Sequence, residues 1–178
     1  VYCVYVPGIR WHIRRIYVLN PIEFTTIRRN EVKSKILGGT AMRIAQGKED
    51  EPYLVTTKQI VQRASMVLTN VRYVIEAEFE MLPEKAAPGD NPGKFQDIVT
   101  RRIRKGQCFS TPYFGCREFP AHFKQWEGGP IPTIDETRDL GFMLYDFDYS
   151  DPQNITPLYF RAKMEHGVIQ VAGCEVFR

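Results

Sequence analysis

The clearest pattern in this sequence is an alternation of apolar and polar residues over 71–81. Every second residue from Val71 to Met81 is apolar, and most of the residues between them are charged. A period of two sustained over this length is typical of a strand with one face in the core and the other in water. The sequence therefore predicts an amphipathic strand here.

A second pattern predicts a helix over 92–105. Asn91 is a suitable N-cap, and Pro92 suits the first helical position. Basic residues cluster in the last turn, where cations favour the helix dipole, and Gly106 is expected to end the helix. One apolar stripe at helical spacing would pack into the core. It consists of Phe95, Ile98, Val99 and Ile103.

The rest of the N-terminal half gives weaker signals. Residues 9–29 are rich in aromatic and β-branched residues and predict two strands with a break near Pro21. Residues 37–52 contain several glycines and charges and predict a long loop or hairpin tip. A short helix is expected across Lys58–Val67.

The C-terminal half consists of short apolar runs, which we interpret mainly as strands. The last two runs flank Glu165-His166-Gly167, a hairpin turn signal. The whole pattern predicts an α+β chain with a C-terminal antiparallel sheet. The runs are Cys108–Phe114, Phe142–Tyr149, Pro157–Met164 and Val168–Ala172.

Composition excludes several classes of protein. The 178 residues are 43% hydrophobic and 25% charged, which is ordinary for a globular domain and unlike a disordered or collagen-like chain. No apolar run approaches the length of about 20 residues that spans a membrane. The first residues lack the basic and apolar regions of a signal peptide. We therefore expect a cytoplasmic protein with no membrane partner.

Charge is unevenly distributed along the chain. The formal net charge is +3, but residues 1–60 and 91–126 each carry a net charge of +5, and residues 127–178 carry −5. Two positive blocks that meet in the fold would attract an anionic partner such as a nucleic acid. Charge alone favours the simpler interpretation, in which each block is a solvated surface.

Lys94 is the most informative single residue. It stands in the first turn of the expected helix beside Gly93, where a cation opposes the helix dipole. Free backbone N–H groups, a glycine and a lysine together suit a phosphate. The local pattern by itself favours the alternative, an ordinary solvated lysine at a helix start.

Two other segments have the composition of a nucleic-acid contact. Thr111–Phe123 places four aromatic residues around Gly115, with Arg117 nearby, which suits stacking on unpaired bases. A core strand with a glycine bulge explains the same composition. Arg28 and Arg29 provide two guanidinium groups for phosphates, or they protect an edge strand by their charge.

Metal and cofactor chemistry have no support in the sequence. The four cysteines form no Cys-x-x-Cys pair, and the three histidines are scattered. We therefore predict neither a metal site nor a cofactor.

Six short motifs follow one another along the chain in a distinctive order and spacing. They are Ile9-Arg-Trp11, Val18-Leu-Asn-Pro-Ile22, Ile27-Arg-Arg-Asn-Glu-Val32, Val71-Arg-Tyr-Val-Ile-Glu-Ala77, Asn91-Pro-Gly-Lys94 and Gly115-Cys-Arg-Glu-Phe119. Each motif is weak alone, but the ordered set is specific. Together the motifs resemble the CRISPR-associated Cas-five family of subtype I-C (Dvulg), and the resemblance runs from about residue 9 to the C-terminus.

This resemblance implies a ferredoxin-like, RNA-recognition-type domain over 1–106, followed by a small antiparallel β domain over 107–178. Family members begin with a strand and a helix before the Ile-Arg-Trp motif, so this chain is expected to lack the front of that domain. The 71–81 strand should then be central, with an unpaired edge or a groove beside it.

The resemblance also implies a metal-independent endoribonuclease. It would cut precursor CRISPR RNA at the repeat hairpin by 2′-hydroxyl attack and then hold the 5′ handle of the mature CRISPR RNA. Its partners would be Cas-seven and Cas-eight type subunits of the Cascade complex. The alternative is a non-catalytic scaffold that caps the handle, with nonspecific binding of double-stranded DNA.

The catalytic group implied by the resemblance is a tyrosine plus a Lys-His pair. The pair reads Lys94-Phe95 here, so the lysine is retained and the histidine is replaced. The tyrosine corresponds to Tyr2 or Tyr5. The residues expected to bind RNA are Arg28, Arg29, Gly93, Arg101, Arg104, Lys105 and Arg117.

Overall fold

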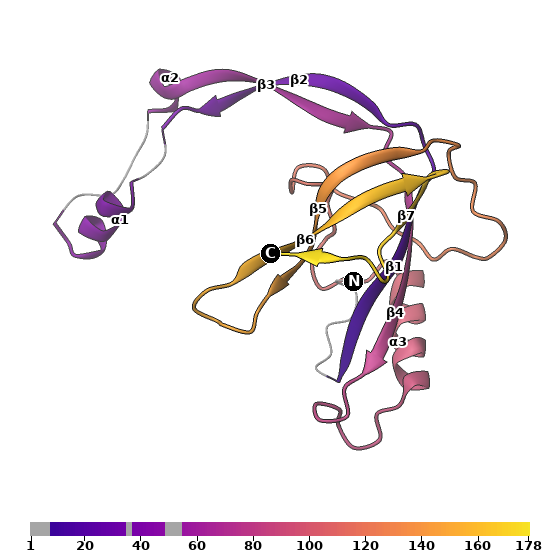
Figure 1. Cartoon of the computed structure of the whole chain (residues 1–178). Helices are drawn as coiled ribbons and strands as arrows, with labels where there is room; N and C mark the ends of the chain where they lie inside the picture. The colour runs from indigo at the N-terminus through magenta and orange to yellow at the C-terminus, as the bar shows by residue number, and fades with distance from the viewer. Residues whose placement is uncertain (1–7, 35–36, 49–54) are drawn as a thin grey trace. The chain divides into compact units, whose positions relative to one another are not determined.

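A computed structural model describes residues 8–34, 37–48 and 55–178 (Figure 1). The chain divides into two compact units, the first formed by residues 1–21 and 72–178 and the second by residues 22–71. Unit 1 contains β1 (Ile9–Val18), β4 (Tyr73–Met81), α3 (Pro92–Arg104), β5 (Arg138–Asp148), β6 (Thr156–Glu165), β7 (Val168–Gln170) and β8 (Val176–Phe177). Unit 2 contains β2 (Glu23–Val32), α1 (Gly38–Ala45), α2 (Thr56–Gln59) and β3 (Ile60–Thr69).

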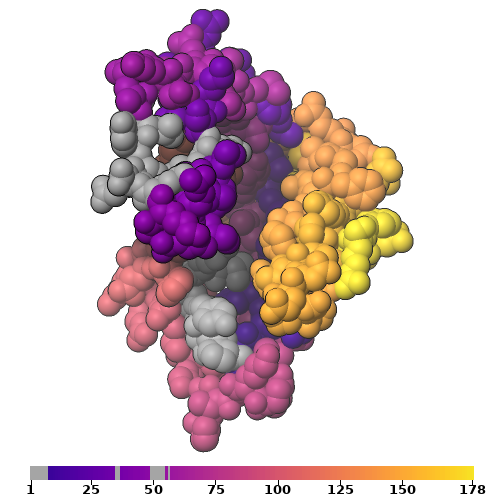
Figure 2. Space-filling view, turned by 90° about the vertical axis from the view of Figure 1, so that its left-hand side faces the viewer, coloured from indigo at the N-terminus to yellow at the C-terminus, as the bar shows by residue number. Residues whose placement is uncertain are grey.

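One antiparallel sheet organises unit 1. Its strands follow the order β4-β1-β7-β6-β5, and β8 pairs with β6. In Figure 1, α3 lies alongside β1 and β4, and in Figure 2 the C-terminal residues from β5 onward form one surface region, drawn in orange to yellow. The predicted α+β class and the C-terminal antiparallel sheet are confirmed. No helix among the described residues is long and apolar enough to cross a membrane.

The amphipathic strand predicted over 71–81 is β4, and it lies at the edge of the sheet. β4 pairs with β1 from Tyr73 to Met81, and no other described strand pairs with it. The expectation of a central position was therefore wrong, because β1 takes β7 as its second neighbour and the sheet grows toward the C-terminal strands. The expected unpaired edge is present in the described part of the chain.

The apolar faces of β1 and β4 form a core beneath α3. Ile9 and Phe95 are buried at its centre. The Phe79 ring makes edge-to-face contacts with Trp11, at 5.2 Å between ring centroids, and with Phe95, at 6.4 Å. This packing follows from the sequence, since the period of two on β4 and the helical stripe on α3 each present one apolar face. Met81, Ile98 and Val99 complete the cluster.

The opposite face of the same two strands is charged. Arginines of β1 pair with glutamates of β4 across the register at 3.0 to 3.4 Å. These arginines belong to the first positive block, so this part of the block is balanced by acidic neighbours. The pairs are Arg10–Glu80, Arg14–Glu78 and Arg15–Glu76.

Unit 2 is built around an antiparallel ribbon of β2 and β3. Its structure shows that two predictions, for residues 37–52 and for Lys58–Val67, were wrong. Residues 38–45 form helix α1 instead of the expected loop, because Gly38 and Gly39 fall in its first turn and helix-forming residues follow them. The helix expected across Lys58–Val67 is mostly strand β3, with only α2 before it. β3 pairs with β2 over its whole length, and this long-range pairing outweighs local helix propensity.

The strands of the C-terminal half lie where the sequence predicts them, except that the first apolar run, Cys108–Phe114, is not a strand. Residues 108–114 form no strand, and this region contributes only an isolated bridge between Tyr113 and Pro120. The run was misread because its aromatic residues cover a surface loop instead of alternating into a core. The predicted hairpin at residues 165–167 is confirmed, with His166 and Gly167 both at positive φ between β6 and β7.

Candidate functional site

The start of α3 is held in place by a tight loop. The Asn91 side chain accepts a hydrogen bond from the Lys94 backbone N–H at 3.0 Å, which caps the helix as predicted. A Cβ on Gly93 would lie 3.2 Å from Oδ1 of Asn91, so glycine leaves room for this capping bond. The loop thereby fixes the direction in which the first turn presents Lys94.

Lys94 forms an ion pair with Asp90. Its ammonium Nζ lies 2.7 Å from Oδ1 of Asp90, whose side chain is only 6% exposed, whereas the Lys94 side chain is 51% exposed. The second carboxylate oxygen of Asp90 accepts the Ala87 backbone N–H at 2.9 Å. The hydrogen bond from Lys94 and the one from Ala87 lower the pKa of Asp90. Asp90 therefore stays ionised and anchors Lys94. The sequence reasoning missed Asp90, because it precedes the N-cap Asn91 and the spacing rule for ion pairs applies only within a helix.

An ammonium group has three N–H donors, and Asp90 takes one of them. The other two donors of Lys94 remain for an anion in solvent. The exposed N-terminus of a helix also favours negative charge. The site is therefore suited to hold a phosphate or to stabilise charge that develops on one.

Phe95, which follows Lys94, is directed into the core. It is 1% exposed and packs against Ile9 of β1 and Phe79 of β4. One residue corresponds to about 100° of rotation on a helix, so Lys94 and Phe95 face different directions. Phe95 is therefore a structural residue, and it neither binds a ligand in solvent nor transfers a proton.

The two candidate tyrosines, Tyr2 and Tyr5, lie outside the described residues. They precede Gly8 in the sequence, and the backbone of Gly8 contacts the loop that leads to Lys94. The Gly8 carbonyl accepts the Leu82 N–H at 2.8 Å, and a Cβ on Gly8 would lie 3.0 Å from Cα of Ala86. The chain thus enters β1 beside the loop of residues 82–91.

Two further predicted RNA-binding residues, Arg101 and Arg104, lie on α3 with Lys94, and a third, Lys105, is the C-cap of the helix. At 3.6 residues per turn, these four residues fall within an arc of about 100°. All four are exposed, and Asp97 is the one acidic residue in the same arc. The arc runs along the solvent side of the helix, opposite the stripe that contains Phe95. We call it the α3 basic stripe; it consists of Lys94, Arg101, Arg104 and Lys105.

Arg117 lies at the tip of a surface loop closed by the Tyr113–Pro120 bridge. The Phe114 N–H donates to the Phe119 carbonyl at 2.9 Å across the loop. Tyr113 and Phe114 are 46% and 42% exposed. The alternative of a core strand is therefore wrong, because the segment is a surface loop with exposed rings, and stacking on unpaired bases stays a prediction.

Arg28 and Arg29 lie on β2, in unit 2. Successive strand residues point to opposite faces, so the two guanidinium groups do not converge on one phosphate. Arg28 is exposed, and Arg29 is half-buried. These arginines belong to a different unit from Lys94.

Among the described residues, no group of three or more histidine, cysteine, aspartate and glutamate side chains is arranged to hold a metal ion.

Comparison with known proteins gives a consistent result. The profile of a family described as "CRISPR-associated protein (Cas_Cas5)" matches residues 4–172. A protein of Mannheimia succiniciproducens named "CRISPR pre-crRNA endoribonuclease Cas5d" is 41% identical over 172 residues, covering 93% of this chain and 75% of that protein. A protein of the same name from Thermus thermophilus is 30% identical over 182 residues, covering 93% of this chain and 72% of that protein.

Two solved structures share the fold. One is a functionally uncharacterized protein from Streptococcus mutans, with a TM-score of 0.61 and 20% identity, covering 99% of this chain and 79% of that one. The other is described as a CRISPR-associated protein, with a TM-score of 0.59, 20% identity and the same coverage. At this level of identity the likeness concerns the fold alone.

Proposed function

Because the chain belongs to the CRISPR-associated Cas5 family, we propose that it is an endoribonuclease that cuts precursor CRISPR RNA. The observation that carries this proposal is the 41% identity, over 93% of the chain, to a relative named a CRISPR pre-crRNA endoribonuclease. The geometry at the start of α3 supports it, since an exposed, anchored lysine faces solvent there. The scaffold alternative is not favoured, because both curated relatives are named as endoribonucleases.

The proposed reaction is a transfer within the RNA backbone. The 2′-hydroxyl oxygen attacks the adjacent phosphorus, and the bond from phosphorus to the 5′-oxygen breaks. A base accepts the 2′-hydroxyl proton, and an acid protonates the departing 5′-oxygen. The products are a 2′,3′-cyclic phosphate and a 5′-hydroxyl, and no metal ion is required.

Lys94 is the proposed source of positive charge at the reacting phosphate. Charge builds up on the phosphorane oxygens in the transition state, and a fixed cation stabilises it most. Asp90 fixes the ammonium by its 2.7 Å contact and leaves two donors for phosphate oxygens. Asp90 is therefore a positioning residue.

A tyrosine from the start of the chain is the proposed proton-transfer group. Tyr2 and Tyr5 remain the candidates that the family resemblance implies. Phe95 does not contribute, since it is buried in the core. Without the histidine, proton transfer depends on fewer groups, and the loss of one acid or base typically costs about 10²- to 10⁴-fold in rate.

We propose that the RNA backbone is bound by the α3 basic stripe and by four further residues, Gly93, Arg117, Arg28 and Arg29. Contacts to phosphates hold a nucleic acid in register without reading its sequence. Cas-seven and Cas-eight type subunits of the Cascade complex are the proposed protein partners. Double-stranded DNA is the proposed ligand of the scaffold alternative.

A ferredoxin-like arrangement over 1–106 and a small β domain over 107–178 are the proposed finer description of the fold. The observed succession β1, β4 and α3 supports the first part, because two antiparallel strands covered by a following helix form half of such a domain. The boundary at residues 106 and 107 stays a prediction.

The test is incubation of the protein with labelled repeat RNA of its own CRISPR array, in EDTA. The proposal expects one cut at the repeat hairpin, with a cyclic phosphate on one product and a 5′-hydroxyl on the other. Absence of cleavage under these conditions and also with added Mg²⁺ would favour the scaffold alternative.

A further inference from the structure

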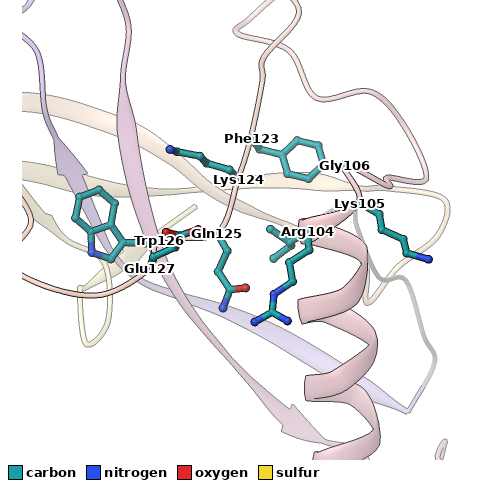
Figure 3. Close-up of a pocket in the computed structure, with 9 residues that line it drawn as sticks. Arg104, Lys105, Gly106, Phe123, Lys124, Gln125, Trp126 and Glu127 are labelled. Atoms are coloured by element: carbon teal, nitrogen blue, oxygen red, sulfur yellow. The ribbon is translucent and has the colours of Figure 1, made fainter.

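A cavity lies at the C-terminal end of α3, away from Lys94. Its volume is about 760 Å³, and it is open to solvent. The end of the helix forms one wall, and an irregular segment over residues 123–127 forms the other. In Figure 3, Arg104 and Gln125 extend in the same direction, whereas Lys105 and Lys124 extend away from each other. The lining combines aromatic, amide and basic groups.

Trp126 is held in position within this wall. Its indole N–H donates to the Gly129 carbonyl at 3.4 Å, and the residue is 36% exposed. Gly128 and Gly129 both have positive φ, at 94° and 82°, which turns the chain back so that this carbonyl reaches the indole. A partly exposed, anchored ring is a surface on which a planar base can stack.

The charge of the cavity suits an anion attached to that base. Three basic residues line it, against the single acid Glu127. None of these three forms an ion pair with another described residue. The helix dipole is negative at this end, with about half an elementary charge, which the basic side chains outweigh. The basic residues are Arg104, Lys105 and Lys124.

The cavity is also connected to the start of α3 by the α3 basic stripe. Arg104 and Lys105 belong both to the stripe and to the cavity lining. Lys105 is the eleventh residue after Lys94, which corresponds to about 16 Å along the helix axis. A single RNA strand that follows the stripe from Lys94 therefore reaches the cavity within a few nucleotides.

We propose that this cavity binds an unpaired nucleotide of the RNA, with the base stacked on Trp126 and the adjoining phosphate held by Arg104. Gln125 extends beside Arg104 and offers both a donor and an acceptor to the edge of the base. Lys105 and Lys124 attract the neighbouring phosphates on either side. The inference rests on the proposed function, in that RNA is the ligand.

The experiment uses the full chain and a short single-stranded oligoadenylate as probe. We expect the oligoadenylate to quench the fluorescence of Trp126, and we expect inorganic polyphosphate not to do so. Trp126→Phe keeps a ring, so binding should persist while the quenching disappears. Trp11, the other tryptophan, packs in the core and provides the constant background.

Two variants test the contacts, and two matched variants serve as controls. Trp126→Ala should weaken oligoadenylate binding by about 5- to 150-fold, the usual effect of losing one stacked base. Arg104→Ala should weaken it as well. Phe109→Ala and Lys163→Ala should have no effect, because both residues are exposed and neither lines the cavity.

The outcomes separate this inference from the proposed function. If Trp126→Ala and Arg104→Ala bind oligoadenylate as tightly as the wild type, the cavity is not a nucleotide site, whatever the cleavage assay shows. Equal quenching by polyphosphate would also overturn the proposal, since base stacking would then not be involved. If quenching and weakened binding are seen but repeat RNA is not cut, the cavity proposal stands and the nuclease proposal fails.

Discussion

At the scale of single residues, Asp90 decides how Lys94 is held. We expect Asp90→Asn to slow RNA cleavage by about 10- to 100-fold, because the loss of a fixed position for a catalytic group commonly has that cost. The amide retains an acceptor for the Ala87 N–H, so the loop should keep its conformation. Single-turnover rates at saturating protein measure the effect. An unchanged rate would show that Lys94 needs no anchor.

The ion pair between Asp90 and Lys94 also makes the stability of the fold depend on pH. The pKa of Asp90 is lowered in the folded protein by the hydrogen bond from Lys94. Its contribution to stability is therefore present above the ordinary pKa of an aspartate and is lost as the pH falls through the lowered value. We expect Asp90→Asn to be less stable than the wild type at neutral pH, and the two to converge in acid. Urea unfolding at a series of pH values measures this difference.

Phe95 has a structural role that the family pattern alone does not reveal. Phe95→Ala should lower the free energy of unfolding by about 3 to 5 kcal/mol, because it leaves a cavity between α3 and the sheet. Phe109→Ala is the control, since Phe109 is 82% exposed and should change stability by less than about 0.5 kcal/mol. Equal effects of the two substitutions in urea unfolding would contradict the assignment of Phe95 to the core.

At the scale of elements, the β6–β7 hairpin depends on Gly167. Its φ is 74°, and a Cβ there would lie 2.4 Å from the Ile134 carbonyl oxygen. Gly173 has a φ of 75° but open space around it. Gly173→Ala should therefore lower the free energy of unfolding by only about 1 to 2 kcal/mol, the cost of placing a Cβ at positive φ. Gly167→Ala should be clearly more destabilising, because its Cβ would also clash with Ile134. Thermal unfolding of both variants tests the difference.

A hydrogen bond between His166, in the same hairpin, and Asp135 makes the stability of the fold depend on pH. Nδ1 of His166 lies 2.5 Å from Oδ1 of Asp135, and this hydrogen bond raises the pKa of His166 above its ordinary value of 6.5. The stabilisation is complete below the ordinary pKa and is lost as the pH rises through the raised one. An NMR titration should show the raised pKa in the wild type and a return toward the ordinary value in Asp135→Asn.

Local signals predicted some elements and missed others for identifiable reasons. The strand at 73–81 and the helix at 92–104 carry their periodicity and cap within a few residues, so the sequence shows them directly. Residues 60–69 form a strand because β2 pairs with them, and nothing in their own order shows that partner. Lys94 was found from the Asn-Pro-Gly-Lys run, whereas the cavity at Trp126 depends on residues brought together by folding.

At the scale of the whole molecule, the two positive blocks are predicted to bind RNA through its phosphates. The affinity for repeat RNA should then fall steeply as salt rises, because each neutralised phosphate releases counterions. The slope should be smaller in a variant in which Arg101, Arg104 and Lys105 are replaced by alanine. Affinity that does not change with salt, measured by fluorescence anisotropy, would contradict this prediction.

The most direct test of the central claim is the single-turnover cleavage rate of repeat RNA by Lys94→Ala, measured in EDTA at saturating protein. Removal of one group that stabilises transition-state charge typically costs about 10²- to 10³-fold, so the variant should cut at least that much more slowly while it still binds the RNA. Lys85→Ala, an exposed lysine of the same loop, should cut at the wild-type rate. If Lys94→Ala cuts as fast as the wild type, Lys94 is not the catalytic cation and the active site lies elsewhere.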